Sequence, residues 1–402
     1  MPMFAPALKR LDAVVAREIE RGSIPGAVVL IRHRGKLVHR AAFGLLDPQQ
    51  ATAMREDAIF RIYSMTKPIA SVALMMLVEE GRLGLRDPVA QHLEEFEAVE
   101  LGVLQCDSRG RETLKRVALP PTTPATPTVP LVHDLLRHTA GLTYGAFGGS
   151  QVKTLYREAG VESGRFDNAE FSRRLARLPL AYPPATVWEY SRSTDLIGSL
   201  IERISGQTLG QFLRERIFDP LKMVDTGFYV ALDKQHRMAE PFAVEPGSGE
   251  PIRLIDGRKA RVFESAGGGL FSTAADYLRF ARMMLGGGSL KGRRLLSRKT
   301  VELMTRDHLG ADLIRASRVP GANNGFLPGP GYGFGLGFAV RVAAGEAPVP
   351  GSLGDYHWIG LAGTYFWIDP AEDLIAIWMM QAPEQRERCW TLYKTLVYAA
   401  LR

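Results

Sequence analysis

The chain has few cysteines and no long apolar run, and both absences exclude classes of protein. Its 402 residues include only two cysteines, Cys106 and Cys389, which cannot form a disulfide framework and lack the spacing of metal ligands. No uninterrupted apolar segment reaches the roughly 18 residues of a membrane-spanning helix. The N-terminal residues lack the basic-then-apolar order of a signal peptide. We therefore expect a cytoplasmic protein with no metal, no cofactor and no membrane partner.

Signals of nucleic-acid binding are also missing, although the net charge is +7 and the pI is near 9.4. The positive charge comes mainly from scattered arginines. The one local cluster, residues 291–294 with Arg298 and Lys299, is typical of a solvated turn and helix start, because no aromatic residues are interleaved with it. No Gly-x-Ser-x-Gly sequence occurs, which argues against an α/β-hydrolase. No nucleic-acid partner is expected.

The most informative segment present is Ser64-Met65-Thr66-Lys67, which places a hydroxyl and an amine three residues apart. Residues at this spacing share one face of a helix, so Lys67 can reach Ser64. A serine hydroxyl is a weak nucleophile unless a neighbouring base takes its proton. The following residues, 69–78, are apolar almost all round, which predicts a buried helix beginning near Ser64. Burial is expected to lower the pKa of Lys67.

The same four-residue pattern occurs a second time, from Ser150 to Lys153, in a loop-like and polar context. Such a short pattern arises by chance, so context must separate the two. For Ser64, too, an ordinary alternative stays open at this point. A serine at a helix start followed by an exposed lysine is commonly an N-cap residue rather than a nucleophile.

Apolar periodicity predicts strands near both ends of the chain and helices between them. The N-terminal region has a helical pattern over residues 8–19, and residues 195–204 and 384–401 are also expected to be helical. Expected strands cover residues 27–31, 37–43, 335–342, 363–368 and 374–380. Residues 120–127 are rich in proline and predict an extended surface loop. One sheet built from both chain ends follows.

Two further segments contain residues suited to ester or amide chemistry. Tyr190 stands just before a predicted helix, and a nearby cation would favour the ionised form that accepts a proton. Residues 357–363 open a predicted strand with small residues that leave backbone N–H groups accessible to a carbonyl oxygen. Taken alone, each has an ordinary explanation: a packed tyrosine ring, and a glycine-rich turn before a strand.

Together and in this order, these segments resemble the serine β-lactamase and penicillin-binding-protein superfamily, in its class C-like branch and closest to family VIII carboxylesterases. The resemblance extends over nearly the whole chain and is carried by residues 60–67, 135–142, 190–191, 267–273 and 357–363. It implies a fold that is α/β plus all-α. A central antiparallel sheet domain, residues 1–81 and 264–402, would accompany a mainly helical domain, residues 82–263.

The resemblance also implies roles for individual residues. Ser64 would be the acylated nucleophile, Lys67 its partner and Tyr190 the general base and acid. The backbone N–H groups of Ser64 and Leu361 would form the oxyanion hole. His357, Trp358 and Gly360 are the expected substrate-binding residues.

Departures from the family pattern indicate the substrate class. Trp358-Ile359-Gly360 stands where β-lactamases and transpeptidases carry Lys-Thr-Gly, and Arg192 stands where they carry Asn. The lysine that would hold a substrate carboxylate is missing, and charge-assisted contacts are among the stronger ones in binding. We therefore expect hydrolysis of short-chain carboxylic esters, with a small-molecule ester as partner. The alternatives are a β-lactamase, a D-amino-acid peptidase, an acyltransferase or a catalytically inactive penicillin-binding-like scaffold.

Overall fold

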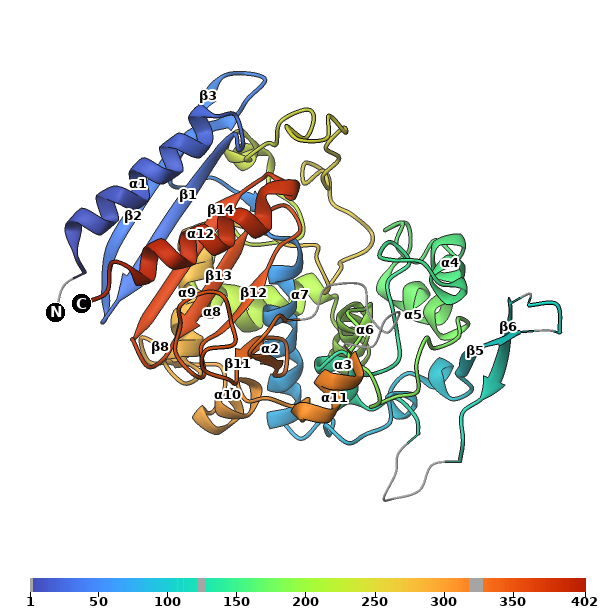
Figure 1. Ribbon diagram of the computed structural model, residues 1–402. Helices are drawn as coiled ribbons and strands as arrows, with labels where there is room; N and C mark the ends of the chain where they lie inside the picture. Colours follow the sequence, from blue (N-terminus) through green and yellow to red (C-terminus); the bar gives the residue numbers. More distant parts are fainter. Residues whose placement is uncertain (1–2, 107, 111, 122–127, 318–327) are drawn as a thin grey trace.

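An eight-stranded antiparallel sheet built from both ends of the chain lies at the centre of the computed structural model (Figure 1). The structure describes residues 3–106, 108–110, 112–121, 128–317 and 328–402. In spatial order the strands are β10 Tyr332–Phe334, β11 Ala339–Arg341, β12 Tyr356–Ile359, β13 Tyr365–Asp369, β14 Leu374–Met380, β1 Gly26–His33, β2 Lys36–Asp47 and β3 Thr52–Ala53. The two chain ends meet where β1 pairs with β14, Val29 lying opposite Trp378. The expected single sheet is thereby confirmed.

The helices and the short two-stranded sheets complete the architecture. The helices are α1 Ala5–Glu20, α2 Thr66–Glu79, α3 Val132–Leu136, α4 Gln151–Glu158, α5 Asn168–Ala176, α6 Ser193–Ser205, α7 Leu209–Leu213, α8 Asp219–Leu221, α9 Ala274–Leu285, α10 Arg298–Met304, α11 Gly310–Ser317 and α12 Arg386–Tyr398. The two-stranded sheets pair β4 Phe60–Arg61 with β7 Phe271–Ser272, β5 Glu100–Cys106 with β6 Glu112–Ala118, and β8 Ser289–Leu290 with β9 Arg293–Arg294. No helix of the described residues is long and apolar enough to span a bilayer.

The central strands β1, β13 and β14 are buried on both faces, and their alternate residues belong to different cores. On β1, Val29 and Ile31 pack in the core that includes residues of α1 and α12. Their neighbours Val28 and Leu30 pack in the larger core on the other face, which includes α2 and α9. Because side chains alternate along a strand, a strand buried on both faces must be apolar without interruption. Figure 1 shows α1 and α12 side by side across one face of the sheet.

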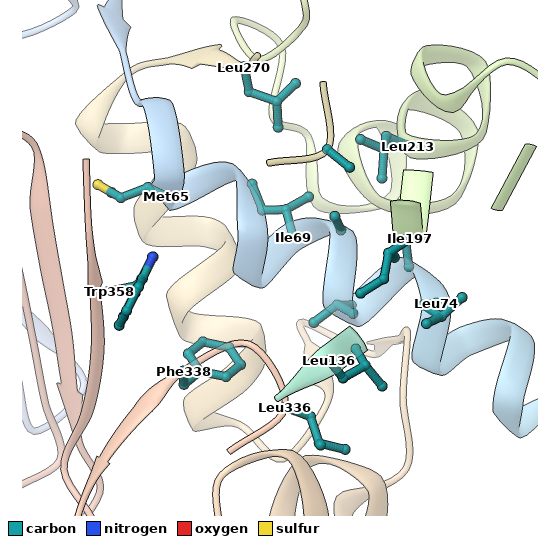
Figure 2. Packing of buried hydrophobic residues seen from close by; sticks show 14 of the residues in the cluster. Met65, Ile69, Leu74, Leu136, Ile197, Leu213, Leu270, Leu336, Phe338 and Trp358 are labelled. Atoms are coloured by element: carbon teal, nitrogen blue, oxygen red, sulfur yellow. The ribbon is translucent and has the colours of Figure 1, made fainter. Parts of the chain in front are cut away.

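Helix α2 runs through the larger core, as its apolar sequence predicts. Every residue from Thr66 to Leu77 is buried. Figure 2 shows its side chains among residues from other elements, with Trp358 of β12 beside Met65 at the N-terminal end of the helix. Pro68 lies in the first turn, where its missing N–H breaks no helical hydrogen bond. The helix is therefore a rigid support for the residues at its start.

Some predicted elements differ from the observed ones. Residues 335–342 are not one strand: β10 ends at Phe334, a turn follows, and β11 begins at Ala339. Gly337 in that turn has φ +96°, a conformation outside the extended region that a continuous strand requires. The hairpin of β5 and β6 was not predicted. Residues 122–127 of the expected proline-rich loop lie outside the described part of the chain, and the division into two domains stays a prediction.

Candidate active site

Ser64 lies at the mouth of a cleft, in the short 3-10 helix η1 (Tyr63–Met65) that leads into α2. The residue before it, Tyr63, has φ 43°, which is unfavourable for a side chain with a Cβ and is typical of strained functional sites. The hydroxyl of Tyr63 accepts a hydrogen bond from the N–H of Ile255 at 2.9 Å, which helps to hold this conformation. The cleft has a volume of about 220 Å³, and Ser64 is partly exposed in it.

Lys67 is 1% exposed, and its ammonium group has three hydrogen-bond acceptors. Lys67 Nζ donates to Ser64 Oγ at 3.2 Å, to Tyr144 Oη at 3.1 Å and to the carbonyl oxygen of Gly267 at 2.6 Å. An ammonium group has three protons to donate, so this arrangement uses all of them. These contacts hold Lys67 Nζ against Ser64 and suit an ammonium group.

The pKa of Lys67 is not lowered, contrary to the expectation from its burial. Burial alone does favour the neutral amine, but the negative charge that Tyr144, Tyr190 and Asp195 can carry outweighs it. The net effect is to raise the pKa of Lys67 above its ordinary value. A Lys67 that stays protonated needs a partner that takes the proton of Ser64, the role expected of Tyr190.

Tyr190 lies beside both Lys67 and Trp358. Lys67 Nζ is 4.6 Å from the centre of the Tyr190 ring, and Trp358 Nε1 donates to Tyr190 Oη at 3.4 Å. The side chain is 4% exposed, and the ring of His138 packs 5.1 Å away. Tyr190, Ser64 and Trp358 all line the cleft. The structure thus brings the predicted nucleophile, its lysine and the predicted base together.

Tyr144 is a site residue that the sequence analysis did not identify. It lines the cleft, accepts a hydrogen bond from Lys67 and packs against Tyr190 with 5.4 Å between ring centres. Burial is the largest influence on its hydroxyl and raises the pKa of Tyr144 to about 12. Tyr144 follows the segment 138–142 by two residues, and that proximity is the only signal that could have found it.

The ion pair between Arg192 and Asp195 is linked to both Tyr144 and Lys67. Arg192 Nη1 contacts Asp195 Oδ2 at 2.9 Å, and the Arg192 guanidinium lies 4.7 Å from the ring centre of Tyr144. Asp195 accepts a hydrogen bond from the N–H of Gly267 at 3.0 Å, and the Gly267 carbonyl in turn accepts from Lys67. Arg192 therefore connects to Lys67 through an unbroken set of contacts. In Gly267, a Cβ would lie 2.7 Å from Asp195 Oδ2, so only glycine fits there.

The end of β12 lies directly against the chain that precedes Ser64. A Cβ on Gly360 would be 2.5 Å from the carbonyl oxygen of Ile62, so the glycine permits this close approach. Thr364 Oγ1 donates to the same carbonyl at 3.2 Å. Leu361 lines the cleft, and its N–H has no acceptor among the described residues. The arrangement leaves this N–H available for a substrate oxygen, as the predicted oxyanion hole requires.

His357 lies outside the cleft that contains Ser64. It precedes Trp358 on β12, so the two side chains point to opposite faces of the sheet. Trp358 lines the Ser64 cleft, whereas His357 does not; His357 lines an adjoining cavity, which Trp358 also lines. Burial, followed by the charges of Lys394 and Arg341, keeps the pKa of His357 well below its ordinary value.

The second copy of the four-residue pattern has a structural role. Ser150 is the N-cap of α4, and its Oγ accepts a hydrogen bond from the N–H of Lys153 at 3.2 Å. Lys153 is buried and forms an ion pair with Glu189 at 3.0 Å. Ser150 is therefore an ordinary N-cap residue, although its lysine is buried rather than exposed. At Ser64, by contrast, no side-chain cap of α2 is present.

Within the described residues, no cluster of three or more His, Cys, Asp or Glu side chains could hold a metal ion. Both cysteines are free thiols, Cys106 exposed and Cys389 buried.

Comparison with known proteins agrees with the geometry. The beta-lactamase family model matches residues 11–396, and the chain belongs to that family. Protein Rv1367c of Mycobacterium tuberculosis is 36% identical over 382 residues, covering 92% of this chain and 89% of that protein. Esterase EstB of Burkholderia gladioli is 31% identical over 385 residues, covering 90% and 87%. The solved structure of EstCE1, a hydrolase with promiscuous acyltransferase activity, superimposes with a TM-score of 0.78 at 25% identity and 98% coverage of each chain. The fold is that of serine β-lactamases and penicillin-binding proteins, and the relatives indicate a hydrolase.

Proposed function

We propose that this protein hydrolyses short-chain carboxylic esters through an acyl-enzyme on Ser64. The observation that carries the proposal is the 3.2 Å contact between Lys67 Nζ and Ser64 Oγ, in a cleft that also holds Tyr190 and Trp358. A serine, a buried cation and a tyrosine in contact are the groups that an activated nucleophile needs. The 31% identity to an esterase supports the same reaction class.

The steps follow from the positions of the side chains. Ser64 Oγ attacks the ester carbonyl carbon while its proton passes to the phenolate form of Tyr190, whose oxygen accepts a hydrogen bond from the Trp358 N–H and whose ring lies beside Lys67. The N–H groups of Ser64 and Leu361 donate to the oxyanion. When the intermediate collapses, the bond to the alcohol oxygen breaks and that oxygen takes the proton from Tyr190. Water then attacks the acyl-enzyme by the same route and restores Ser64.

The lining of the cleft supports esters over β-lactams. Trp358 occupies the position of the family's carboxylate-binding lysine and presents an apolar ring to the cleft. Phe147 and Phe228 add further apolar surface. A volume of about 220 Å³ suits a small acyl group. Arg261 and Arg386 also line the cleft, so an ester with a distant carboxylate would not be repelled.

Acyl transfer to an alcohol is a second candidate activity. The solved relative EstCE1 is described as a hydrolase with promiscuous acyltransferase activity. Transfer differs from hydrolysis only in the nucleophile that attacks the acyl-enzyme, and both would use Ser64 and Tyr190 in the same way. The ratio of transesterified product to free acid, measured with added alcohol, separates the two.

An ester panel with intact-mass detection tests the proposal. Purified protein is mixed with p-nitrophenyl acetate, butyrate and octanoate, with nitrocefin, and with a D-alanyl-D-alanine peptide. We expect turnover of the acetate and butyrate and an acylated protein mass that is absent from Ser64→Ala. A fluorophosphonate probe should label the wild type at Ser64. No ester turnover and no label would instead favour an inactive scaffold. The cytoplasmic location stays a prediction from the sequence.

A further inference from the structure

A second cavity, lined by residues of β12 and α12, adjoins the Ser64 cleft. Its volume is about 490 Å³, more than twice that of the cleft. Trp358, Ile359, Arg386 and Trp390 line both spaces, so the two meet at these residues. Small-molecule sites in proteins commonly have volumes of about 300–1,000 Å³. The adjoining cavity falls in that range, whereas the cleft itself does not.

A row of four aromatic rings forms one wall of the second cavity and reaches the cleft. The ring centres of Tyr332 and His357 are 4.8 Å apart, those of His357 and Tyr365 are 5.7 Å apart, and those of Tyr365 and Trp390 are 5.7 Å apart. Trp390 Nε1 donates to the carbonyl oxygen of Gly363 at 3.3 Å, which holds the last ring at the junction. Such a wall suits a flat apolar group, because rings pack edge-to-face or offset against one another.

The polar groups of the cavity favour a neutral ligand over an anionic one. Lys394 lines the cavity, but its ammonium group is already bound by Tyr332 Oη at 3.0 Å and by both carboxylate oxygens of Asp355, at 3.3 and 3.2 Å. Its charge is therefore compensated within the protein. His357 Nδ1 is buried and has no hydrogen-bond partner among the described residues. A buried polar atom without a partner is costly, and a ligand could supply the missing bond.

We propose that the second cavity is a compartment of the active site that holds the distal ring of a large ester while its carbonyl lies at Ser64. The ligand is a flat apolar ring system with one neutral hydrogen-bonding group that reaches His357. The inference rests on the proposed esterase function and extends its substrate class from small esters to those with a ring on a spacer. The ring can belong to the alcohol or to the acyl part, and the two sources are tested separately.

Two series of probes test the compartment. One series consists of acetates of ω-(2-naphthyl)alkanols and the other of methyl esters of ω-(2-naphthyl)alkanoic acids, each with increasing numbers of spacer methylenes. In at least one series, kcat/KM should rise about ten- to a hundredfold once the spacer is long enough for the ring to pass Trp390. The reason is that the ring is then buried in the apolar cavity, which strengthens binding of the substrate and of the transition state. A rise only with the acetates assigns the ring to the alcohol, and a rise only with the methyl esters assigns it to the acyl part.

Filling the cavity should remove this rise and leave small esters unaffected. Thr391 is an exposed residue of α12 that lines the cavity, so Thr391→Trp should block it without disturbing the core. Thr395→Trp, one turn further along the same exposed side and outside the cavity, is the matched control. Val349→Trp fills the cavity from another segment, with Val342→Trp as its control. Both filling variants should lose the rise, whereas both controls should keep it.

Turnover of p-nitrophenyl acetate separates failure of this inference from failure of the esterase proposal. If the wild type hydrolyses that ester but neither series shows a rise, or if filling the cavity leaves the rise unchanged, the compartment plays no part in substrate binding. His357→Phe keeps a ring but removes Nδ1. It should lower the preference for 6-hydroxynaphthyl over naphthyl probes by about three- to tenfold, and an unchanged preference would remove His357 from the site.

Discussion

Replacing Tyr144 and Tyr190, the two tyrosines beside Lys67, with phenylalanine one at a time tests which of them accepts the proton of Ser64. Both contact Lys67 and both line the cleft. A hydroxyl with the raised pKa of Tyr144, about 12, is ionised in only about one molecule in ten thousand at pH 8. Tyr190, which also accepts a hydrogen bond from Trp358, has a neighbour that Tyr144 lacks. We therefore assign the base role to Tyr190.

The two variants should lower kcat/KM to different extents. Tyr190→Phe should lower kcat/KM by about 10²–10⁴-fold, the usual contribution of general-base assistance. Tyr144→Phe removes one of three acceptors of Lys67 and leaves a buried N–H unpaired, which costs about 1–3 kcal/mol or roughly ten- to a hundredfold in rate if it displaces Lys67. The loss in Tyr144→Phe should therefore be the smaller one.

Initial rates with p-nitrophenyl acetate between pH 6 and 9, together with the rate of fluorophosphonate labelling, measure both effects. Tyr229→Phe, at an exposed tyrosine that does not line the cleft, is the control and should match the wild type. A near wild-type rate in Tyr190→Phe combined with a loss of 10²-fold or more in Tyr144→Phe would refute the assignment. The base would then be Tyr144, and Tyr190 would only position Lys67.

Three further predictions follow from other parts of the structure. Ser64→Ala should abolish ester turnover and covalent labelling, and labelling that survives this change would contradict the site. Ser150→Ala should instead lower the free energy of unfolding, measured with urea, by only about 1 kcal/mol, because it removes an N-cap. Trp358→Lys with Ile359→Thr recreates the family's Lys-Thr-Gly, so the ratio of kcat/KM for nitrocefin to kcat/KM for the ester should rise by about ten- to a hundredfold. Nitrocefin turnover by the wild type as fast as its ester turnover would overturn the ester assignment. Burial raises the pKa of Asp276 from 3.8 to about 6, so the stability that this group provides is full below pH 3.8 and is lost as the pH rises through about 6. Relative to the wild type, Asp276→Asn should therefore be more stable at pH 8 than at pH 5 by about 1 kcal/mol, and an equal difference at both pH values would argue against this shift.

The local pattern of residues was sufficient for the features that depend on neighbours in the chain. The apolar residues after Ser64 predict a buried helix because no face of it can be left in water, and α2 is buried as expected. The apolar segments near both termini likewise predict strands, and β1 and β14 pair with each other. A Ser and a Lys three residues apart on a helix are in contact for the same local reason.

The tertiary structure alone decided what depends on residues far apart in the chain. The pKa of Lys67 depends on groups far from it in the chain, Tyr144, Tyr190 and Asp195, which act against the burial that the sequence made evident. Tyr144 gains its place because the chain after α3 passes beside Lys67, a path that no pattern within the sequence specifies. His357 and Trp358 are adjacent in sequence, but only Trp358 lines the Ser64 cleft, because a strand sends successive side chains to opposite faces and each face is covered by different elements.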